Sequence, residues 1–507
     1  MTSFPPQEST QFAFFTAENR LYDLATPLGA DTLIVERFVG REALSTLTAW
    51  HIDCLSTDLH LPLKRLLGQQ AILYTRLADG SQGSRSGYVT AVAQLGADGG
   101  FARTRLTLQP WLALARHQRR SRVFQDTSVL DMIEAVLAAY RPRSHWRLTP
   151  DAELFLAGLR PRSYCCQYRE TDYDFLLRLL TEEGIGFYFE EADDAGSLSH
   201  QRLVLFADST AFADDPAMPD GIRFHRNAAV ETHDTLQSFH AHRRLQAAST
   251  TLASWDDQTK RVTAATLPTA HTYGGPNAPR IEQYDWAGVY AFAGHDQAEH
   301  YARLLREAAD ARFKTWFGHG AVRSLRTGHA FDLLDSPLDQ RAELGLPEAG
   351  QAPHRFTLLG VLHAGINNLS SGLQHHLQTH LGHPPAWEDE PDAGTGRSDD
   401  SDDDDEHTHL APGAWETLLE TAGATGYANR FTAIRADIPW RPALYDGTGR
   451  LLKPKPTAWG SQTAIVVGAD GSTAAAGTVH TDGLGRIRIR YHWQQEERHT
   501  CWVRVAQ

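Results

Sequence analysis

Cysteine is scarce in this sequence of 507 residues, and its placement excludes several small-domain architectures. The four cysteines are Cys54, Cys165, Cys166 and Cys501. They are too few and too scattered for a disulfide framework, and no C-x-x-C motif supports a zinc ribbon or a thioredoxin-like site. The vicinal pair could act as a redox switch. On a strand, however, its side chains point to opposite faces, so we expect at least one to be buried as a small hydrophobe.

Long apolar runs and an excess of positive charge are also missing. No run approaches the ~20 apolar residues that a membrane-spanning helix needs. The first residues, MTSFPPQESTQFAFF, lack the basic and apolar regions of a signal peptide. The formal net charge is −14, which disfavours binding along nucleic acid or on an anionic membrane. We therefore expect synthesis in a cytoplasm without a signal peptide, and no nucleic-acid partner.

Motifs of catalysis and nucleotide binding are absent from the sequence. The segment GSRSG places Arg85 where a nucleophile elbow requires serine. There is no P-loop, and no G-x-G-x-x-G follows an expected strand. We predict no catalytic residue, no cofactor and no enzymatic activity.

What the sequence does contain is a series of short β-rich segments. Residues 31–110 hold five alternating or β-branched runs, separated by turn signals such as ADG and GADGG, and this spacing predicts a barrel or sandwich. A second β-rich block begins near residue 201, with QRLVLFAD, FDLL and HRFTLLGVLHAG as strands and DQAEHYARLLREAADARF as a helix. The sequence therefore predicts a mainly β protein with α+β elaborations.

The densest pattern is YRETDYDFLLRLLTEEGIGFYFE, residues 168–190. Thr171 stands three residues before Asp174, an Asp variant of the capping box, and the apolar residues of FLLRLL then recur at helical spacing. Gly184 suits the position after a helix end. With the strands SYCCQY before it and IGFYFE after it, the stretch predicts a β–α–β packing unit. Upstream, DTSVLDMIEAVLAAYRP predicts another helix, capped by Thr127 or Ser128.

The acids of this unit could include a general acid–base pair. The structural alternative is that Asp174 caps the helix, where a negative charge is favourable. Glu182 and Glu183 fall in the last turn, where we expect them to pair with arginines; Arg178 lies four residues before Glu182. We expect the structural role.

The sequence changes character after residue 366. The polar run INNLSSGLQHHLQTHLGHPP is followed by the acidic run EDEPDAGTGRSDDSDDDDEHTH. Because such a charge block repels itself and buries no apolar surface, residues 367–426 are expected to form a mobile inserted loop. His376 and His380, at i and i+4, are weak candidates for a metal site. Without H-E-x-x-H, a solvated loop with adventitious nickel or zinc binding is the expectation.

The C-terminal part, from YANRFTAIRADIPWRP onward, again predicts strands. The run RIRIRYHW, residues 486–493, alternates between an apolar face and a face with Arg486, Arg488 and Arg490. Arginines beside aromatics are typical of nucleic-acid-binding barrels. The alternative, which we prefer, is the outer face of a structural strand whose arginines pair with acidic neighbours.

Several segments together resemble the signature blocks of a known family. They are LQPWLALARHQRRSRVFQDTSVLDMI (residues 108–133), the stretch 168–190, and HTDGLGRIRIRYHW with CWVRVAQ (within residues 480–507). LIVERFVGREALS and YANRFTAIRADIPWRP fit the same pattern. In this order and spacing, the sequence resembles the VgrG family of spike proteins of type VI secretion systems, which are similar to the fused hub and spike proteins of contractile phage tails.

The resemblance implies a domain plan of paired β-barrels with helices, a phage-tail-hub-like base region, followed by a small barrel of the oligonucleotide/oligosaccharide-binding (OB) type. The expected divisions are an N-terminal segment (1–30), the base region (31–366), the inserted loop (367–426), the end of the hub region (427–445) and the OB-type barrel (446–507). In the family a β-helix needle normally follows the segment WVRVAQ, so we expect the needle to lie outside this chain.

The family's signature positions fall on residues for which the resemblance implies a structural role. They are Trp111, Phe124, Asp126, Tyr168, Arg169, Glu170, Asp172, Phe175, Leu179, Glu183, Gly184, Asp482, Gly485, Arg486, Trp493, Trp502 and Val503.

The function implied by the resemblance is that of a homotrimeric spike and hub. Such a trimer caps the inner-tube protein, carries a tip protein and effectors through the needle, contacts membranes only transiently and is secreted by contraction. Two other classes remain open: a glycan-cleaving hub enzyme, in the manner of phage spikes with a lysozyme domain, and a nucleic-acid- or carbohydrate-binding barrel.

Overall fold

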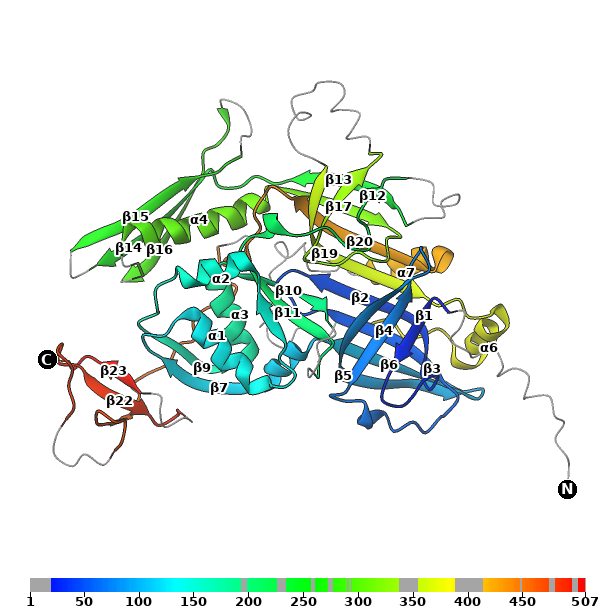
Figure 1. Ribbon diagram of the computed structural model, residues 1–507, viewed down its shortest axis with the longest axis horizontal. Helices are drawn as coiled ribbons and strands as arrows, with labels where there is room; N and C mark the ends of the chain where they lie inside the picture. The colour runs from blue at the N-terminus through cyan, green and yellow to red at the C-terminus, as the bar shows by residue number, and fades with distance from the viewer. Residues whose placement is uncertain are drawn as a thin grey trace.

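The structure is a computed structural model in which strands predominate (Figure 1). It describes residues 20–506 except 193–197, 226–233, 257–259, 272–276, 290, 293, 337–353, 388–413, 447–448, 474–478 and 495–499. The prediction of a mainly β protein with α+β elaborations is confirmed. None of the described helices is long and apolar enough to cross a membrane.

A 12-stranded sheet forms the base region, with the order β1-β4-β5-β6-β3-β2-β19-β20-β17-β13 and the β12–β18 pair attached at β19. Its strands are β1 Tyr22–Ala25, β2 Ile34–Ala43, β3 Ala49–Ser56, β4 Gln70–Arg76, β5 Gln82–Asp98, β6 Phe101–Gln109, β12 Ile222–Arg223, β13 Leu236–Arg243, β17 Lys314–Gly320, β18 Ala330–Leu334, β19 Arg355–Ile366 and β20 Tyr427–Arg435. The five runs predicted within residues 31–110 are β2 to β6.

Each half of this sheet encloses its own apolar core. One core surrounds Trp50 and Phe38 beneath β1 to β6, and the other surrounds Trp316, Phe356 and Phe431 of β17, β19 and β20. Two cores along one continuous sheet agree with the predicted pairing of two β units. The predicted N-terminal boundary at residue 30 is wrong, because β1 pairs with β4 along its whole length and belongs to the sheet.

A helical unit lies between strands β6 and β12 in the chain. It contains β7 Arg119–Phe124, α1 Val129–Leu137, β8 Trp146–Leu148, α2 Pro150–Ala157, β9 Cys165–Thr171, α3 Asp172–Glu182, β10 Gly186–Glu191 and β11 Gln201–Phe206. Ser128 caps α1 by accepting a hydrogen bond from the Asp131 amide at 3.1 Å. The predicted β–α–β unit is confirmed, although its two strands join different sheets: β9 pairs with β7, and β10 pairs with β11.

A second satellite is the sheet β15-β14-β16, formed by β14 Ser249–Asp256, β15 Arg261–Pro268 and β16 Glu282–Val289. The predicted helix α4, His295–Ala311, packs on one of its faces (Figure 1).

The segment predicted as an inserted loop contains two helices, so that prediction is wrong for its described parts. Helix α6, Ser371–Leu381, lays Leu377 against Leu55 and Phe101, and α7, Ala414–Thr425, packs beside β19 and β20. Asn367 at its start is buried and bonded to β1 and β2 backbone. The acidic run itself lies outside the described residues.

The C-terminal segment forms a three-stranded antiparallel sheet of β21 Ala464–Val466, β22 Ile487–Tyr491 and β23 Cys501–Val503 (red in Figure 1). We call it the terminal sheet. The described strands fit part of an OB-type barrel, and its closure stays a prediction.

Candidate functional site at the junction of the base region and the terminal sheet

Both ends of helix α3 are fixed by local interactions. The Thr171 hydroxyl accepts a hydrogen bond from the Asp174 amide at 3.0 Å, as the capping pattern predicts. At the other end Gly184 adopts φ +66°, and a side chain there would clash with Leu304 of α4. A glycine is therefore favoured both by the turn and by the close approach of α4.

Asp172, the first residue of α3, is fully buried and surrounded by donors. It accepts hydrogen bonds from Arg122 at 2.9 Å, Tyr140 at 2.8 Å and Gln167 at 2.9 Å, and Arg120 lies 3.3 Å away. A buried carboxylate of this kind is stable only because its lone pairs are satisfied. Asp172 therefore ties strand β7, helix α3 and the residues after α1 together.

The remaining acids of the unit are paired with arginines, as expected for Glu182 and Glu183. Arg178 binds Glu170 at 2.9 Å and approaches Glu182 at 3.5 Å, while Arg162 binds Glu182 at 2.6 Å and also holds Glu183. Burial opposes ionisation of Glu182, yet the surrounding cations, Arg162 foremost, outweigh it and lower the pKa of Glu182. A general acid needs a raised pKa, so this arrangement favours structure over catalysis.

The apolar interior of the helical unit contains four of the signature residues. Trp111, Phe175 and Leu179 are fully buried, and the rings of Phe124 and Phe175 stack with centroids 5.8 Å apart. These residues hold β7 against α3, and β7 is in turn the strand on which the terminal sheet docks.

The terminal sheet docks on β7 and β9 through one apolar cluster. Ile489 and Cys501 of the sheet are buried together with Val123 of β7, and the ring of Tyr168 in β9 meets Trp493 edge-on at 5.2 Å. The Trp502 amide donates to the Gln125 side chain at 2.7 Å. We call this contact the junction; Val503 packs at its margin.

Two residues near the junction adopt a left-handed backbone conformation. Asp126 and Arg169 have φ of +52° and +55°, a region that non-glycine residues seldom adopt. The register between β7 and β9 slips beside Arg169, since Arg120 faces Glu170 whereas Arg122 faces Gln167; Asp126 lies after the end of β7. This bulge re-aims Tyr168 toward the terminal sheet. Nothing in the alternation of the sequence indicates it, although both residues fall at signature positions.

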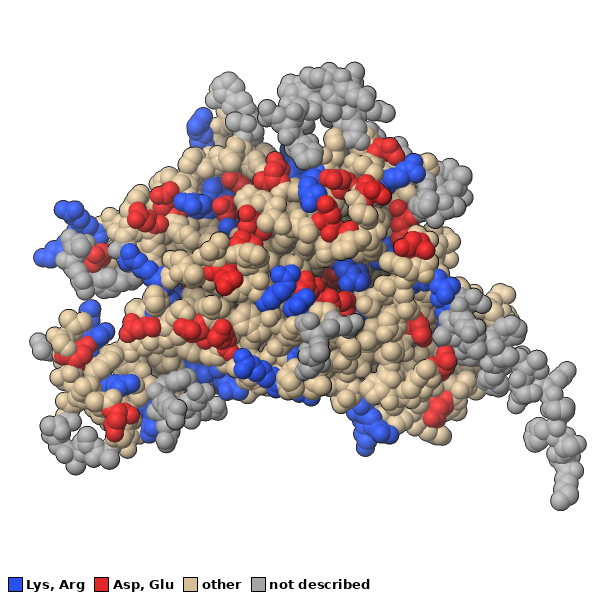
Figure 2. Space-filling model, in the orientation of Figure 1, with Lys and Arg blue, Asp and Glu red and all other residues tan. Residues whose placement is uncertain are grey.

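Two members of the arginine face of β22 are engaged within the chain. Arg486 pairs with Asp482 at 2.6 Å, across a turn in which Gly485 has φ +70°. Arg488 donates to Thr500 at 2.5 Å and to the Ala469 carbonyl at 2.7 Å, and Trp502 lies beside His480. On the visible face of the molecule, basic and acidic side chains are interspersed (Figure 2).

The candidate metal residues lie together on α6, as their spacing requires. The rings of His376 and His380 are 4.4 Å apart; His376 bonds to the Gly99 carbonyl at 2.8 Å, and His380 lies 3.6 Å from Asp98. Among the described residues, no group of three or more His, Cys, Asp or Glu side chains could hold a metal ion.

The four cysteines are free thiols. Cys165 is buried, as expected for one member of the vicinal pair, and Cys166 is half-buried. Burial raises the pKa of both and brings that of Cys166 to about 11, which disfavours the reactive thiolate.

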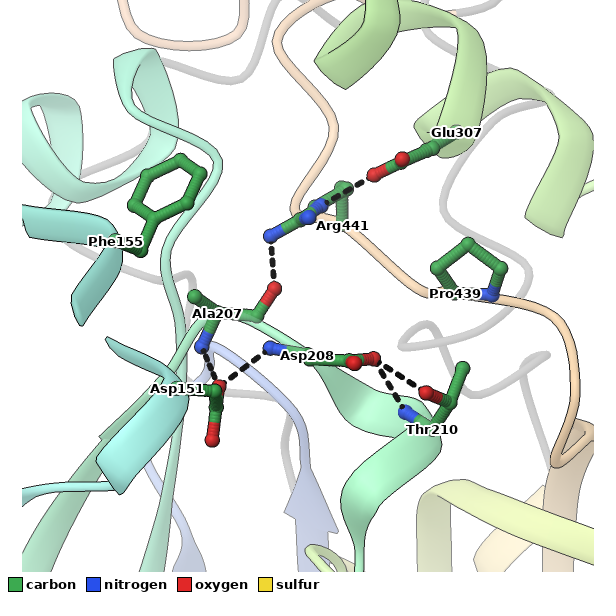
Figure 3. A pocket seen from close by; sticks show the side chains of 8 residues that line it. All are labelled: Asp151, Phe155, Ala207, Asp208, Thr210, Glu307, Pro439 and Arg441. Carbon is green, nitrogen blue, oxygen red and sulfur yellow. Dashed lines mark hydrogen bonds and ion pairs between the residues drawn. The ribbon is translucent and has the colours of Figure 1, made fainter. Parts of the chain in front are cut away.

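A shallow pocket of about 330 Å³ lies where the helical unit and α4 meet the segment that follows β20, from residue 436, toward the terminal sheet; we call this segment the link (Figure 3). Arg441 crosses it, binding Glu307 at 2.7 Å, the Gly184 carbonyl at 3.2 Å and the Ala207 carbonyl. Asp151 accepts from the amides of residues 207 and 208. These polar side chains of the pocket thus form hydrogen bonds with other residues of the same chain. Arg441, which the sequence patterns did not single out, holds the link in place.

Comparison with known proteins agrees with this geometry. The family model described as phage tail baseplate hub (GPD) matches residues 41–368. The chain is 27% identical over 496 residues to the type VI secretion system spike protein VgrG1b of Pseudomonas aeruginosa, covering 97% of this chain and 55% of the relative. For VgrG1c of the same organism the identity is 26%, covering 97% of this chain and 57% of the relative.

Among solved structures, the chain matches the E. coli c3393 protein with a TM-score of 0.56 and 18% identity, covering 95% of this chain and 92% of that one. That protein is described as a type VI secretion component with structural similarity to the T4 phage tail proteins gp27 and gp5. This chain spans little more than half the length of the curated relatives named above. The chain belongs to the phage tail baseplate hub family, and relatives that match nearly its whole length are type VI secretion spike proteins of the VgrG family.

Proposed function

We propose that this chain is the hub and upper spike of a type VI secretion system. The observation that carries the proposal is the junction, where residues of the base region and of the terminal sheet meet in one apolar cluster. A spike must pass axial force from its base to its tip without bending. Closely packed interiors transmit such strain because they yield little to compression.

The proposal includes a homotrimer whose base caps the inner-tube protein of the secretion system. Further partners, a tip protein and effectors, would bind through a needle beyond this chain. The protein would be made in the bacterial cytoplasm, assembled in the apparatus and secreted by contraction, touching the target membrane only as it passes. The signature residues would act as structural elements of the base and of the neck.

An enzymatic hub is the main rival, and the described contacts favour the structural role. Each acid of α3 and its flanks has an arginine, a cap or a buried hydrogen bond as partner. For nucleic-acid binding, the partnered Arg486 and Arg488 count against a free basic surface. Peptidoglycan turnover that is lost in Glu182→Gln would revive the enzyme.

Size-exclusion chromatography with light scattering tests the assembly. The proposal predicts a species of three times the 56.3 kDa chain mass. A monomer up to about 100 µM, well above the dissociation constants of stable assemblies, would contradict it. Electron microscopy of the trimer should then show the three terminal sheets around the axis.

A further inference from the structure

The sheet β14–β16 is covered on one face only. On that face Leu252 and Ala265 pack against Ala298 and Ala302 of α4. Successive side chains of a strand point to opposite faces of the sheet, so the neighbours of Leu252 in β14 and of Ala265 in β15 point away from α4. Figure 1 shows this sheet reaching outward from the rest of the base region, with α4 along one side.

The opposite face, which we call the outer face, carries large apolar side chains. Val262 of β15 is 53% exposed, and Tyr284 and Trp286 of β16 are 58% and 48% exposed. The strand register places Ala253 of β14 directly between Ala264 and Trp286, so the apolar positions are continuous across the sheet. Contiguous apolar patches of this kind mark interaction sites on soluble proteins.

The edge strand β15 is protected against strand addition. It begins with Arg261, directly after Lys260, and ends at Pro268, which lacks an amide donor. Charged residues and proline are devices by which edge strands avoid pairing with another chain. A partner is therefore expected on the outer face and not along this edge.

The size of the outer face indicates what covers it. Three strands of eight residues each present an area on the order of 400 Å². A stable complex of two independent proteins buries about 800 Å² on each partner, so this face alone is too small for one. Copies of this chain in a closed ring can use so small a face. Each chain then makes two different contacts with its neighbours, and ring closure makes individually weak contacts cooperative.

The charge of the chain bears on association between copies. The whole chain has a net charge of −14, which opposes association of copies unless cations lie at the contact. Lys260 and Arg261 place two cations at the tip of this sheet, and the same stretch contains Asp256, which faces Arg261 across the strands, and Asp257, so the tip is balanced in charge although the whole chain is acidic. This end of the sheet therefore adds little to the repulsion between copies.

We propose that the outer face of β14–β16 is a contact surface between neighbouring copies of this chain, with Tyr284 and Trp286 as its anchors. This inference rests on the proposed trimer, which it makes specific. Aromatic side chains at the centre of an interface dominate its binding energy.

The test uses the 507-residue chain in two arms. In the first, light scattering compares the native chain with the double variant Tyr284→Glu/Trp286→Glu and with the control Leu154→Glu, which changes an even more exposed apolar residue on α2. In the second, a photo-crosslinking amino acid is placed at position 284. Circular dichroism and thermal melting check that each variant folds.

The expected result is a trimer for the native chain and the control, at least a 100-fold weaker association for the double variant, and a chain–chain adduct from position 284. A native trimer that the double variant preserves, without a chain–chain adduct, would overturn this inference and leave the proposed function standing. Adducts to another protein alone would do the same. A native monomer would overturn both. If the double variant does not fold, the crosslink decides by itself.

Discussion

Helices α3 and α6 begin alike and end in different surroundings. Thr171 accepts a hydrogen bond from the amide three residues ahead at 3.0 Å, and Ser370 does the same at 3.4 Å. Yet α3 buries eight of its eleven residues, whereas α6 buries only Leu377. A helix with charged residues can therefore be buried when those residues have partners in the core, as in α3. Helix α6 stays at the surface because it packs only one row of leucines against its neighbours, Leu373, Leu377 and Leu381, which we call the leucine strip.

The comparison also shows what the sequence could predict. The cap at Thr171, the FLLRLL spacing and Gly184 identified α3 correctly, because each is a local signal. Helix α6 carried a local signal too, since Leu373, Leu377 and Leu381 recur every four residues, but the polar run and the acidic block after it led to the prediction of a loop. The prediction followed the polar composition of this run, although the spacing of its leucines is the more direct signal of a helix.

The junction could not be predicted from local patterns. It depends on the bulge at Arg169, which turns Tyr168 toward Trp493, a residue far away in the chain. The sequence predicted that arginines would pair with Glu182, but it could not identify Arg162 as one of them, because Arg162 precedes α3 and reaches it only in the folded chain. Long-range contacts of this sort follow from tertiary packing and not from periodicity.

The largest effect is expected at the buried acid of α3. Asp172→Asn keeps the shape but leaves Arg122 and Arg120 without a buried counter-charge, so the free energy of unfolding should fall by about 3–5 kcal/mol. Denaturant unfolding measures it. The matched change Asp131→Asn, in the exposed first turn of α1, should cost less than about 1 kcal/mol. Equal losses would show that burial does not distinguish the two acids.

The leucine strip of α6 gives the next effect. Leu377→Ala should destabilise this helix by about 2 kcal/mol, since its side chain fills the space against Leu55 and Phe101. Hydrogen exchange of the amides in α6 should accelerate about 30-fold, while that in α3 stays unchanged. The control His375→Ala, at an exposed position of the same helix, should leave both unchanged. Unaltered exchange after Leu377→Ala would mean that something other than the strip holds α6.

A buried histidine in β19, His363, differs in its protonation from the more exposed histidines of α6. His363 in β19 is fully buried, with Tyr427 at 2.6 Å and Glu42 at 3.7 Å. Burial lowers the pKa of His363 to about 3, despite Glu42 and with Arg85 and Arg326 adding to the effect. The stabilisation from the neutral ring is therefore complete above pH 6.5 and is lost as the pH falls toward 3, because the unfolded chain takes up the proton first.

The corresponding prediction is that His363→Gln removes about 2 kcal/mol from the loss of stability between pH 7 and pH 5, to which His300, His319 and His329 also contribute because desolvation lowers the pKa of each. Thermal melting of the two proteins across this range measures the difference. The double variant His376→Gln/His380→Gln should retain the native pH dependence. If it were the one that flattened the profile, the assignment to His363 would be wrong.

The smallest effect in free energy bears on the central claim, that the junction joins the base region and the terminal sheet into one body. Trp493→Ala removes an aromatic pair worth about 1 kcal/mol, so local opening of the terminal sheet should become easier. The measurement is hydrogen exchange of the β22 and β23 amides in native and variant chains. We expect native protection matching that of β9, and roughly fivefold faster exchange in β22 and β23 after Trp493→Ala with β9 unchanged. Terminal strands that already exchange independently of β9 in the native chain, and that do not respond to Trp493→Ala, would contradict it.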